Sequence, residues 1–292
     1  MSLKFKVQIM NLLNKINLRN SSLAGFCSLA ILSLSSCEQD AVQTLPERNW
    51  ELTWSDEFNG TAGTSPDASK WTYDIGTGNG GWGNQELQYY TNRPENISLD
   101  GSGNLVITAK KENFSGSAFS SARIKTKGKF EQAYGRFEAR LKTPYGPGVW
   151  PAFWMLGADI DQVPWPQVGE IDIMELRGQE PHIINSTLHG PGYSGGSALT
   201  KAFGLPDGRY DTDFHIFAVE WTENQIDFFV DGYLYHRQTR ESVSQRGDWV
   251  YNSPFFLLLN VAVGGNYVGF PTDGTPFPQK MTVDYVRVYK QK

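Results

Sequence analysis

The stretch Gly169-Glu-Ile-Asp-Ile-Met-Glu-Leu176 decides the fold of this 292-residue chain. It places three carboxylates within six residues, among apolar neighbours that are typical of a β-strand. Glu170 and Asp172 share one face of an extended strand, and Ile171 and Ile173 share the other, which we expect to pack into a core. The alternative is a strand with a solvated acidic face. Burial of ionised groups is unfavourable, and buried carboxylates therefore indicate a functional site. The surrounding residues decide between the two interpretations.

Glu175 is out of phase with the other two carboxylates. Residues on one face of a regular strand recur at every second position, and counting by twos from Glu170 leads to Met174. One extra residue near Ile173 and Met174 would return Glu175 to the face of Glu170 and Asp172. The sequence therefore predicts a β-bulge at this point.

The N-terminal region has the layout of a signal peptide. Residues 1–36 carry four basic and no acidic side chains, and an apolar run over residues 23–34 is too short for a membrane span. Leu34-Ser-Ser-Cys37 resembles a bacterial lipobox, which implies cleavage before Cys37 and acylation of that cysteine; the alternative is an ordinary cleavage site with a cysteine nearby. We expect residues 37–48 to form a polar tether and residues 49–292 to form the folded domain.

The charge and the cysteine content exclude several classes of protein. Of the 26 basic and 31 acidic side chains, four basic and no acidic ones lie in residues 1–36, so the remainder has a net charge of about −9. This argues against nucleic acid as a partner. Cys27 and Cys37 are the two cysteines, and Cys27 lies in the predicted signal peptide. The mature chain can form no internal disulfide, so its stability must come from its core and from any bound metal.

From Trp50 onward, the pattern is β almost throughout. Apolar and polar residues alternate over 104–110 and 133–143, Asp231-Gly232 indicates a two-residue hairpin, and residues 255–263 form an apolar run typical of a central strand. About a dozen strands separated by turns, without a long amphipathic helix, predict one antiparallel β-sandwich. The spacing G-x-G-x-x-G at residues 76–81 lacks the βαβ context of a dinucleotide site.

Aromatic residues make up 13% of the chain, and two of them precede the acidic strand. Trp150 and Trp154 have even spacing and therefore share one face of a strand. Sugar rings bind to apolar platforms flanked by hydrogen-bonding groups, and this pair would suit such a site. A core position for either tryptophan is the alternative.

The acidic stretch resembles the active-site signature of glycoside hydrolase family 16 in its bulged form, E-x-D-x-x-E. The likeness extends over nearly the whole mature chain and includes further segments. These are Trp54-Ser-Asp-Glu-Phe-Asn-Gly60, Trp82-Gly-Asn-Gln-Glu-Leu-Gln-Tyr-Tyr-Thr91, Trp150-Pro-Ala-Phe-Trp-Met-Leu156, Thr187-Leu-His-Gly-Pro-Gly-Tyr-Ser-Gly-Gly196 and Asp284-Tyr-Val-Arg-Val-Tyr289. Together they resemble the laminarinase-type endo-β-1,3-glucanases of that family.

The resemblance implies a β-jelly-roll sandwich with a concave substrate cleft and a retaining double displacement. By position, Glu170 is implied as the nucleophile, Glu175 as the acid/base and Asp172 as a hydrogen-bond partner of the nucleophile. A retaining glycosidase needs its two carboxyl groups about 5 Å apart, whereas Glu170 and Glu175 leave the backbone roughly 13 Å apart even with the bulge. A concave, twisted sheet would let the two side chains lean together.

The resemblance also implies binding residues. Six positions match residues that line the glycone subsites of relatives: Asn84, Arg123, Trp150, Trp154, His189 and Asn260. A calcium ion on the opposite face is common in the family, and Glu57, Gly103 and Asp284 would hold it; oxygen-only ligands suit calcium. The chemistry itself would need no cofactor.

Together these observations predict a secreted endo-β-1,3-glucanase that is anchored to a bacterial membrane through Cys37 and that we expect to be a monomer. One alternative is the same machinery acting on mixed-linkage β-1,3-1,4-glucan or on an algal galactan, and another is a sandwich that binds glycan without cleaving it. Transglycosylation would use the same catalytic residues. Arg177 and Trp165-Pro-Gln-Val168 depart from the pattern of many relatives and leave the preferred linkage less secure than the chemistry.

Overall fold

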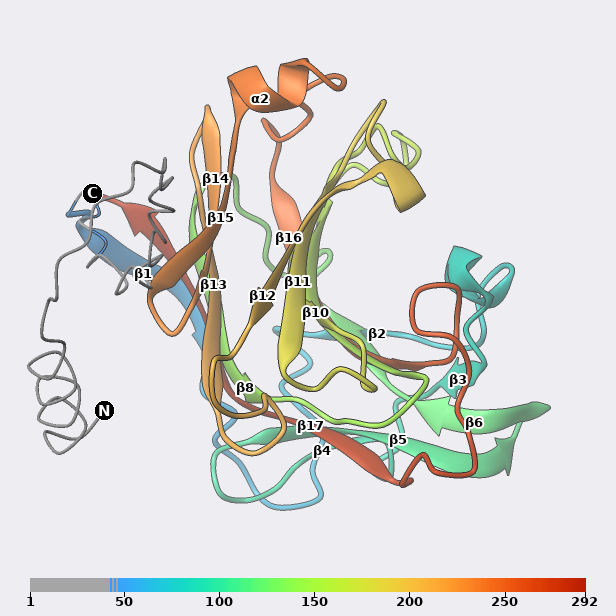
Figure 1. Ribbon diagram of the computed structural model, residues 1–292. Coiled ribbons are helices and arrows are strands. Elements are labelled where there is room, and N and C mark those ends of the chain that lie inside the picture. The colour runs from blue at the N-terminus through green and yellow to red at the C-terminus, as the bar shows by residue number, and fades with distance from the viewer. Residues whose placement is uncertain (1–42, 44, 46) are drawn as a thin grey trace, which may run out of the picture. The chain divides into compact units, whose positions relative to one another are not determined.

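The computed structural model describes residues 43, 45 and 47–292 (Figure 1). The predicted signal peptide, the acylation site at Cys37 and most of the predicted tether lie outside these residues and remain predictions. No helix in the described part of the chain is long and apolar enough to cross a membrane.

The described residues form two β-sheets, as the strand pattern predicts. The ten-stranded sheet has the order β15-β14-β13-β8-β17-β5-β6-β3, with β1 also paired to β17 and β4 to β5. Its strands are β1 (Trp50–Asp56), β3 (Gln88–Tyr90), β4 (Ile97–Leu99), β5 (Leu105–Phe114), β6 (Ser117–Ser121), β8 (Gly135–Lys142), β13 (His215–Trp221), β14 (Gln225–Val230), β15 (Tyr233–Thr239) and β17 (Gln279–Gln291). Its pairs are antiparallel except β3 with β6.

The seven-stranded sheet has the order β12-β11-β10-β9-β16-β7-β2. Its strands are β2 (Thr72–Asp74), β7 (Arg123–Lys125), β9 (Val149–Gly157), β10 (Glu170–Leu176), β11 (Ile183–His189), β12 (Leu199–Gly204) and β16 (Phe255–Val263). Helices are short: a 3-10 turn η3 (Gly195–Ser197) and α2 (Arg240–Ser244). The segment η2 (Gly81–Gln85) is an irregular turn in which Trp82 and Gly83 have positive φ. The chain is therefore the antiparallel sandwich that the sequence predicts.

The core lies between the two sheets. In Figure 1, β10 and β11 belong to one layer and β13 to the other, and β10 packs across the core from β13. All nine residues of β16 are buried, which confirms the prediction of a central strand from its unbroken apolar run. The hairpin at Asp231-Gly232 is also confirmed: both residues have positive φ, as a two-residue turn between β14 and β15 requires.

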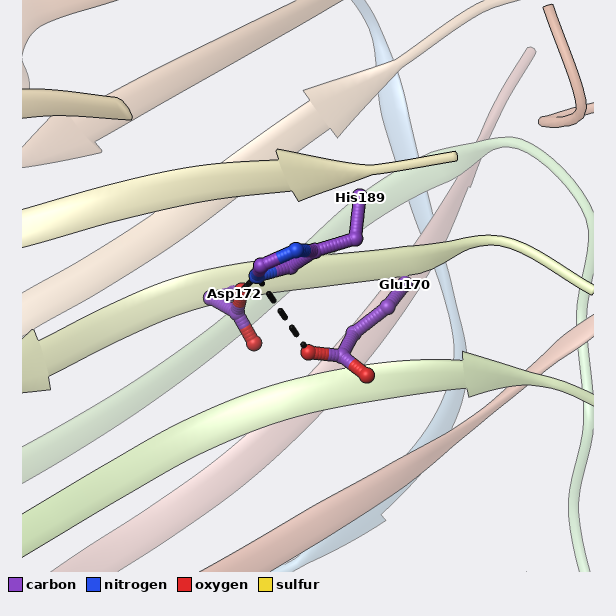
Figure 2. Close-up of side chains that lie close together, drawn as sticks. All are labelled: Glu170, Asp172 and His189. Atoms are coloured by element: carbon purple, nitrogen blue, oxygen red, sulfur yellow. Dashed lines mark ion pairs between the residues drawn. The ribbon is translucent and has the colours of Figure 1, made fainter. Parts of the chain in front are cut away.

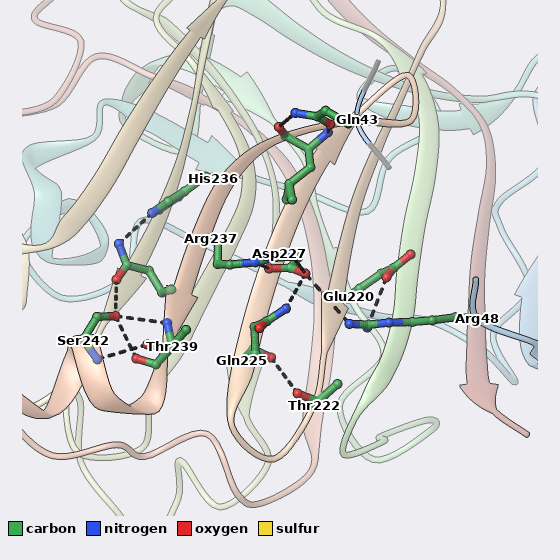
Figure 3. A network of polar contacts seen from close by, with 12 residues as sticks. Gln43, Arg48, Glu220, Thr222, Gln225, Asp227, His236, Arg237, Thr239 and Ser242 are labelled. Carbon is green, nitrogen blue, oxygen red and sulfur yellow. Dashed lines mark hydrogen bonds and ion pairs between the residues drawn. The ribbon is translucent and has the colours of Figure 1, made fainter. Parts of the chain in front are cut away.

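The residues just before β1 are bound to the ten-stranded sheet (Figure 3). Arg48 lies 3.1 Å from Glu220 and 3.9 Å from Asp227, which also pairs with Arg237 at 2.7 Å. The side-chain amide of Gln43 exchanges two hydrogen bonds with the backbone of Leu234 in β15. These contacts cover part of an edge strand that would otherwise offer free backbone groups. The described end of the predicted tether is thus attached to the domain.

Candidate active site

The predicted bulge is present in β10 and is seen from both neighbouring strands. Asp172 lies opposite Trp154 of β9, and Glu175 lies opposite Ala152, so β10 uses one residue more than β9 over this span. The pairing with β11 shows the same excess. Ile173 and Met174 are both fully buried in the core. The extra residue therefore absorbs the phase error and turns Glu175 to the outer face of the seven-stranded sheet.

Glu175 is held by two hydrogen bonds on that face. The indole N–H of Trp150 donates to Glu175 Oε1 at 3.1 Å, and the Thr187 hydroxyl donates to Glu175 Oε2 at 3.3 Å. The residue is 9% exposed. A carboxylate that accepts such bonds has a fixed direction, which is what a group that transfers a proton to a bound substrate needs.

Glu170, Asp172 and His189 gather at the other end of the strand (Figure 2). His189 is directly opposite Glu170 in the ladder, so the two side chains share a face. His189 Nε2 lies 3.2 Å from Asp172 Oδ2 and 3.6 Å from Glu170 Oε1. The indole N–H of Trp165 donates to Glu170 Oε2 at 3.0 Å. Each oxygen of Glu170 therefore faces a polar hydrogen.

The tautomer of His189 follows from its contacts. The backbone N–H of Gly195 donates to Nδ1 at 3.1 Å, so Nδ1 acts as an acceptor. In the neutral ring the proton then sits on Nε2, the ring nitrogen that lies beside the two carboxyls, although Asp172 Oδ2 has no hydrogen-bond partner among the described residues in this arrangement. The Tyr251 hydroxyl donates to the carbonyl of His189 at 2.9 Å and fixes the backbone at this point.

The three carboxyls cannot all be ionised in this setting. Burial raises the pKa of Glu170 to about 8, and repulsion from Asp172 adds to the shift. Burial, followed by repulsion from Glu175, raises the pKa of Asp172 well above its usual value. Burial also raises the pKa of Glu175, against the opposing effect of His189. These three carboxyls, Glu170, Asp172 and Glu175, form what we call the carboxylate row. Because they interact, the row retains protons at neutral pH.

A second hydrogen-bond network runs from Trp154 to Glu86. The indole N–H of Trp154 donates to Asn260 Oδ1 at 2.8 Å, and Asn260 Nδ2 donates to the Tyr90 hydroxyl at 3.2 Å. Tyr90 in turn donates to Glu86 Oε2 at 3.2 Å, and Asn84 donates to the other oxygen of Glu86 at 3.3 Å. Because every bond points toward one carboxylate, the orientations of Trp154, Asn260 and Asn84 depend on one another.

Arg123 lies beside this network. Its guanidinium is 3.8 Å from the ring centroid of Trp82, and its Nε donates to Asp74 Oδ2 at 2.6 Å. Arg123 is opposite Asn260 in the ladder between β7 and β16, so both side chains lie on one face. The guanidinium thus joins the glycine-rich turn that bears Trp82 to the floor of the site.

The structure therefore brings the predicted site residues to one face in two groups. Trp150 and His189 contact the carboxylate row, and Trp154, Asn260, Asn84 and Arg123 form the neighbouring network. Contacting residues that the sequence did not single out are Trp165, Thr187, Gln88 and Tyr267. Position gave a signal for Thr187 and Gln88, because both occur in segments that carried the resemblance, and Trp165 begins a segment noted as a departure from relatives.

The expected calcium ligands have other partners. Glu57 makes a bidentate pair with Arg287 at 2.8 and 2.9 Å, and Asp284 accepts from Arg140 at 2.6 Å. Two guanidinium groups next to the expected ligands disfavour a divalent cation, because like charges repel. These residues fit a calcium site poorly unless backbone carbonyls such as that of Gly103 supply most of the ligands, and the site stays a prediction.

Within residues 47–292, the one group of acidic and histidine side chains close enough to share an ion is Glu170, Asp172 and His189. Trp165 donates to Glu170, and the unpaired Asp172 Oδ2 suits a carboxyl that holds a proton. We therefore assign the group to acid chemistry.

Comparison with known proteins gives a consistent result. The model of the family described as glycosyl hydrolases family 16 matches residues 84–287. A beta-glucanase of Rhodothermus marinus is 44% identical over 252 residues, which cover 83% of this chain and 86% of that protein. The laminarinase catalytic domain of Thermotoga maritima has a TM-score of 0.79 and 46% identity, over 84% of this chain and 99% of that one. The laminarinase of Flavobacterium sp. UMI-01 has a TM-score of 0.74 and 41% identity, over 82% of this chain and 100% of that one.

Proposed function

This chain belongs to family 16 of the glycosyl hydrolases, and we propose that it is an endo-β-1,3-glucanase that cleaves laminarin-like glucan by a retaining double displacement. The observation that carries the proposal is the row of three carboxylates, in which the bulge in β10 brings Glu175 to the face of Glu170 and Asp172. The chain also covers nearly the full length of the laminarinase domains to which it is similar.

In the first step, a Glu170 oxygen attacks the anomeric carbon of the sugar, and the bond from that carbon to the leaving oxygen breaks. Glu175 gives its proton to the leaving oxygen. The Trp150 N–H and the Thr187 hydroxyl then stabilise the carboxylate that remains, since both already donate to Glu175.

In the second step, water attacks the same carbon, Glu175 takes a proton from the water, and the bond to Glu170 breaks. Two inversions at one carbon return the original configuration. Only the carboxyls and water take part, so the chemistry calls for no cofactor.

Glu170 must be ionised when it attacks, although its pKa of about 8 favours the protonated form in the free enzyme at neutral pH. Asp172 resolves this conflict, because its own pKa is raised well above the usual value and it can hold the proton. A protonated Asp172 would donate to Glu170, with which it shares a hydrogen bond. His189 Nε2, at 3.6 Å from Glu170 Oε1, would donate to the same carboxylate after a small approach. The nucleophile would thus be a carboxylate stabilised by three donors, with Trp165 as the third.

The alternatives are weaker. A sandwich that only binds glycan has no need of three mutually repelling buried carboxyls, and all three are present. Sulfated galactans call for basic subsites, whereas the mature chain has a net charge of about −9 by the predicted cleavage.

A comparison of substrates tests the proposed function. The purified domain is incubated with laminarin, mixed-linkage glucan, agarose and carrageenan, and the products are separated by chromatography. We expect internal cleavage of laminarin, and no product from Glu170→Gln, which keeps the shape of the side chain but removes the nucleophile. Proton NMR of the first products should show the β-anomer. Failure to cleave either glucan, or an initial α-anomer, would contradict the proposal.

We also propose that the enzyme is a monomer attached to a bacterial membrane through Cys37, in line with the lipobox-like sequence. Expression of the full chain in a bacterial host should place it in the membrane fraction, and Cys37→Ser should release it. A Cys37→Ser chain that stays with the membrane would argue against acylation.

A further inference from the structure

We propose that Arg177 is a positioning residue for Glu175: its guanidinium supplies the positive charge at this end of the carboxylate row and fixes the aromatic pair Tyr267 and Trp150 against Glu175. The inference rests on the proposed function, because it assigns a task to a residue next to the acid/base. It goes beyond that function by making Arg177 responsible for when Glu175 gives up its proton.

A continuous set of contacts links Arg177 to Glu175. The Arg177 guanidinium lies 4.5 Å from the ring centroid of Tyr267, and that ring lies 5.0 Å from the ring of Trp150. The Trp150 N–H donates to Glu175 Oε1. The segment that carries Arg177 is fixed as well, because Gly178 N–H donates to the Val149 carbonyl at 2.8 Å.

The loop that bears Tyr267 is tied to the same segment. The side-chain amide of Gln179 donates to the carbonyl of Val268 at 3.0 Å. Arg177 and Tyr267 are therefore held together by two independent contacts, one through the backbone of the loop and one through the stacked guanidinium. Such a stack of an arginine on an aromatic ring is worth about 0.5–1 kcal/mol at an exposed site.

The charge of Arg177 is not neutralised by a strong partner. Its ion pair with Glu180 has a separation of 3.6 Å, and both side chains are about two-fifths exposed. Exposed pairs of this kind contribute little. Among the described residues, the buried Arg177 Nε has no hydrogen-bond partner. The guanidinium therefore remains available to act on nearby carboxyls.

Several titratable groups face Glu175, and Arg177 is the permanent cation among those that affect it. Asp172 repels the Glu175 carboxylate, and His189 on β11 attracts it. The charge of Glu175 in turn raises the pKa of Tyr267 and of Tyr235. Arg177 lowers the pKa of Glu175 against the larger effect of burial. It is not among the causes of the shift at Glu170, which relies on His189 and Trp165 instead. His189 acts on both Glu170 and Glu175, whereas Arg177 acts on Glu175 and not on Glu170.

This division fits the two tasks of Glu175. The group must lose a proton in the first step and must be ionised to accept one in the second. A fixed positive charge favours the ionised form at both moments, so Arg177 would set the upper pH limit of the reaction.

The test uses Arg177→Met, which keeps a long apolar stem, and Arg177→Lys, which keeps the charge. Arg240→Met on the exposed helix α2 is the matched control for loss of a distant positive charge. The first readout is a carbon-13 NMR titration of the glutamate carboxyls, with Glu175→Gln used to assign the signal. We expect Arg177→Met to raise the pKa of Glu175, and the other two variants to leave it unchanged.

The second readout is the pH profile of kcat on laminarin, in which the alkaline limb should move upward by the same amount in Arg177→Met alone. An unchanged Glu175 pKa in Arg177→Met, or an equal shift in Arg177→Lys, would overturn the proposal. Because the NMR titration needs no turnover, it decides the role of Arg177 even if the wild-type chain does not cleave laminarin. That separate result would count against the proposed function instead.

Discussion

Deletion of Ile173 tests whether the bulge in β10 serves only to turn Glu175 outward. Asp172 and Glu175 are three positions apart on β10, but their partners are two positions apart on both β9 and β11. Without Ile173 the three strands have equal lengths over this span. Every remaining pair can therefore keep its register, and Glu175 should stay on the outer face.

The expected loss of stability follows from the burial of Ile173, and the expected kcat follows from the strand register. Ile173 is completely buried, so its loss should cost about 2–5 kcal/mol. For a domain of this size, that cost lowers Tm by about 5–15 °C. Glu170 and Glu175 lie opposite Leu156 and Ala152, and this span on β9 does not change. The distance between the two carboxyls should be preserved, so we expect kcat within about tenfold of wild type, or about 1.4 kcal/mol in the barrier.

Insertion of one alanine between Ile173 and Met174 is the matched opposite change. It puts Glu175 four positions after Asp172, so a regular strand would keep Glu175 on the outer face but move it two positions along β9 and β11. That shift carries Glu175 about 7 Å further from Glu170, beyond the reach of a double displacement. Release of reducing ends from laminarin measures activity, and thermal unfolding followed by circular dichroism measures stability. The deletion variant should be less stable but active, and the insertion variant inactive.

One result would refute this reasoning about β10. A deletion variant that folds but is as inactive as Glu170→Gln would show that Ile173 does more than set the phase of the strand. A fully active insertion variant would show that Glu175 reaches the substrate by another path.

Three further predictions concern protonation, the hydrogen bond to the acid/base and the metal. Because the folded-state pKa of Glu170 is about 8, against a usual value of 4.5, ionisation costs stability as the pH rises from 4.5 to 8. The Tm of Glu170→Gln should therefore exceed that of wild type at pH 8 and equal it at pH 4. An equal Tm for the two proteins at both pH values would show that the pKa of Glu170 is not raised by folding. Trp150→Phe removes the 3.1 Å bond to Glu175 and should lower kcat about 10- to 100-fold, with retained fold checked by circular dichroism; a wild-type kcat would exclude a role for this bond. Since Asp284 is paired with Arg140, EDTA should change the Tm by less than about 2 °C, whereas a large drop that calcium reverses would establish the metal site.

Much of the site could be predicted because it follows from positions along strands. The period of two placed Glu170 with Asp172, and the misfit of Glu175 required the bulge that the structure contains. Trp150 and Trp154 have even spacing, and both contact polar groups of the site. These are local properties of the backbone, and they hold wherever the strand lies in the fold.

Partners that lie outside the strand could not be predicted in this way. Trp165 reaches Glu170 from the loop just before β10, and Arg123 stacks on Trp82 across more than forty positions of sequence. Such contacts depend on the order of the strands and on the paths of loops, which no periodicity encodes. The same limit applies to the expected calcium ligands, where the pattern gave no sign that Arg140 and Arg287 would pair with them.

The sequence by itself determined the class of fold, the central strand and the phase of the three carboxylates, because alternation and turn residues act through the nearest backbone. The tertiary structure decided how those carboxylates behave. Sheet order placed His189 opposite Glu170, and packing buried the row deeply enough to raise the pKa of all three acids. Burial and partner geometry are properties of the assembled sheets. The fold therefore decides which carboxyls hold a proton at neutral pH, and the sequence of β10 alone does not.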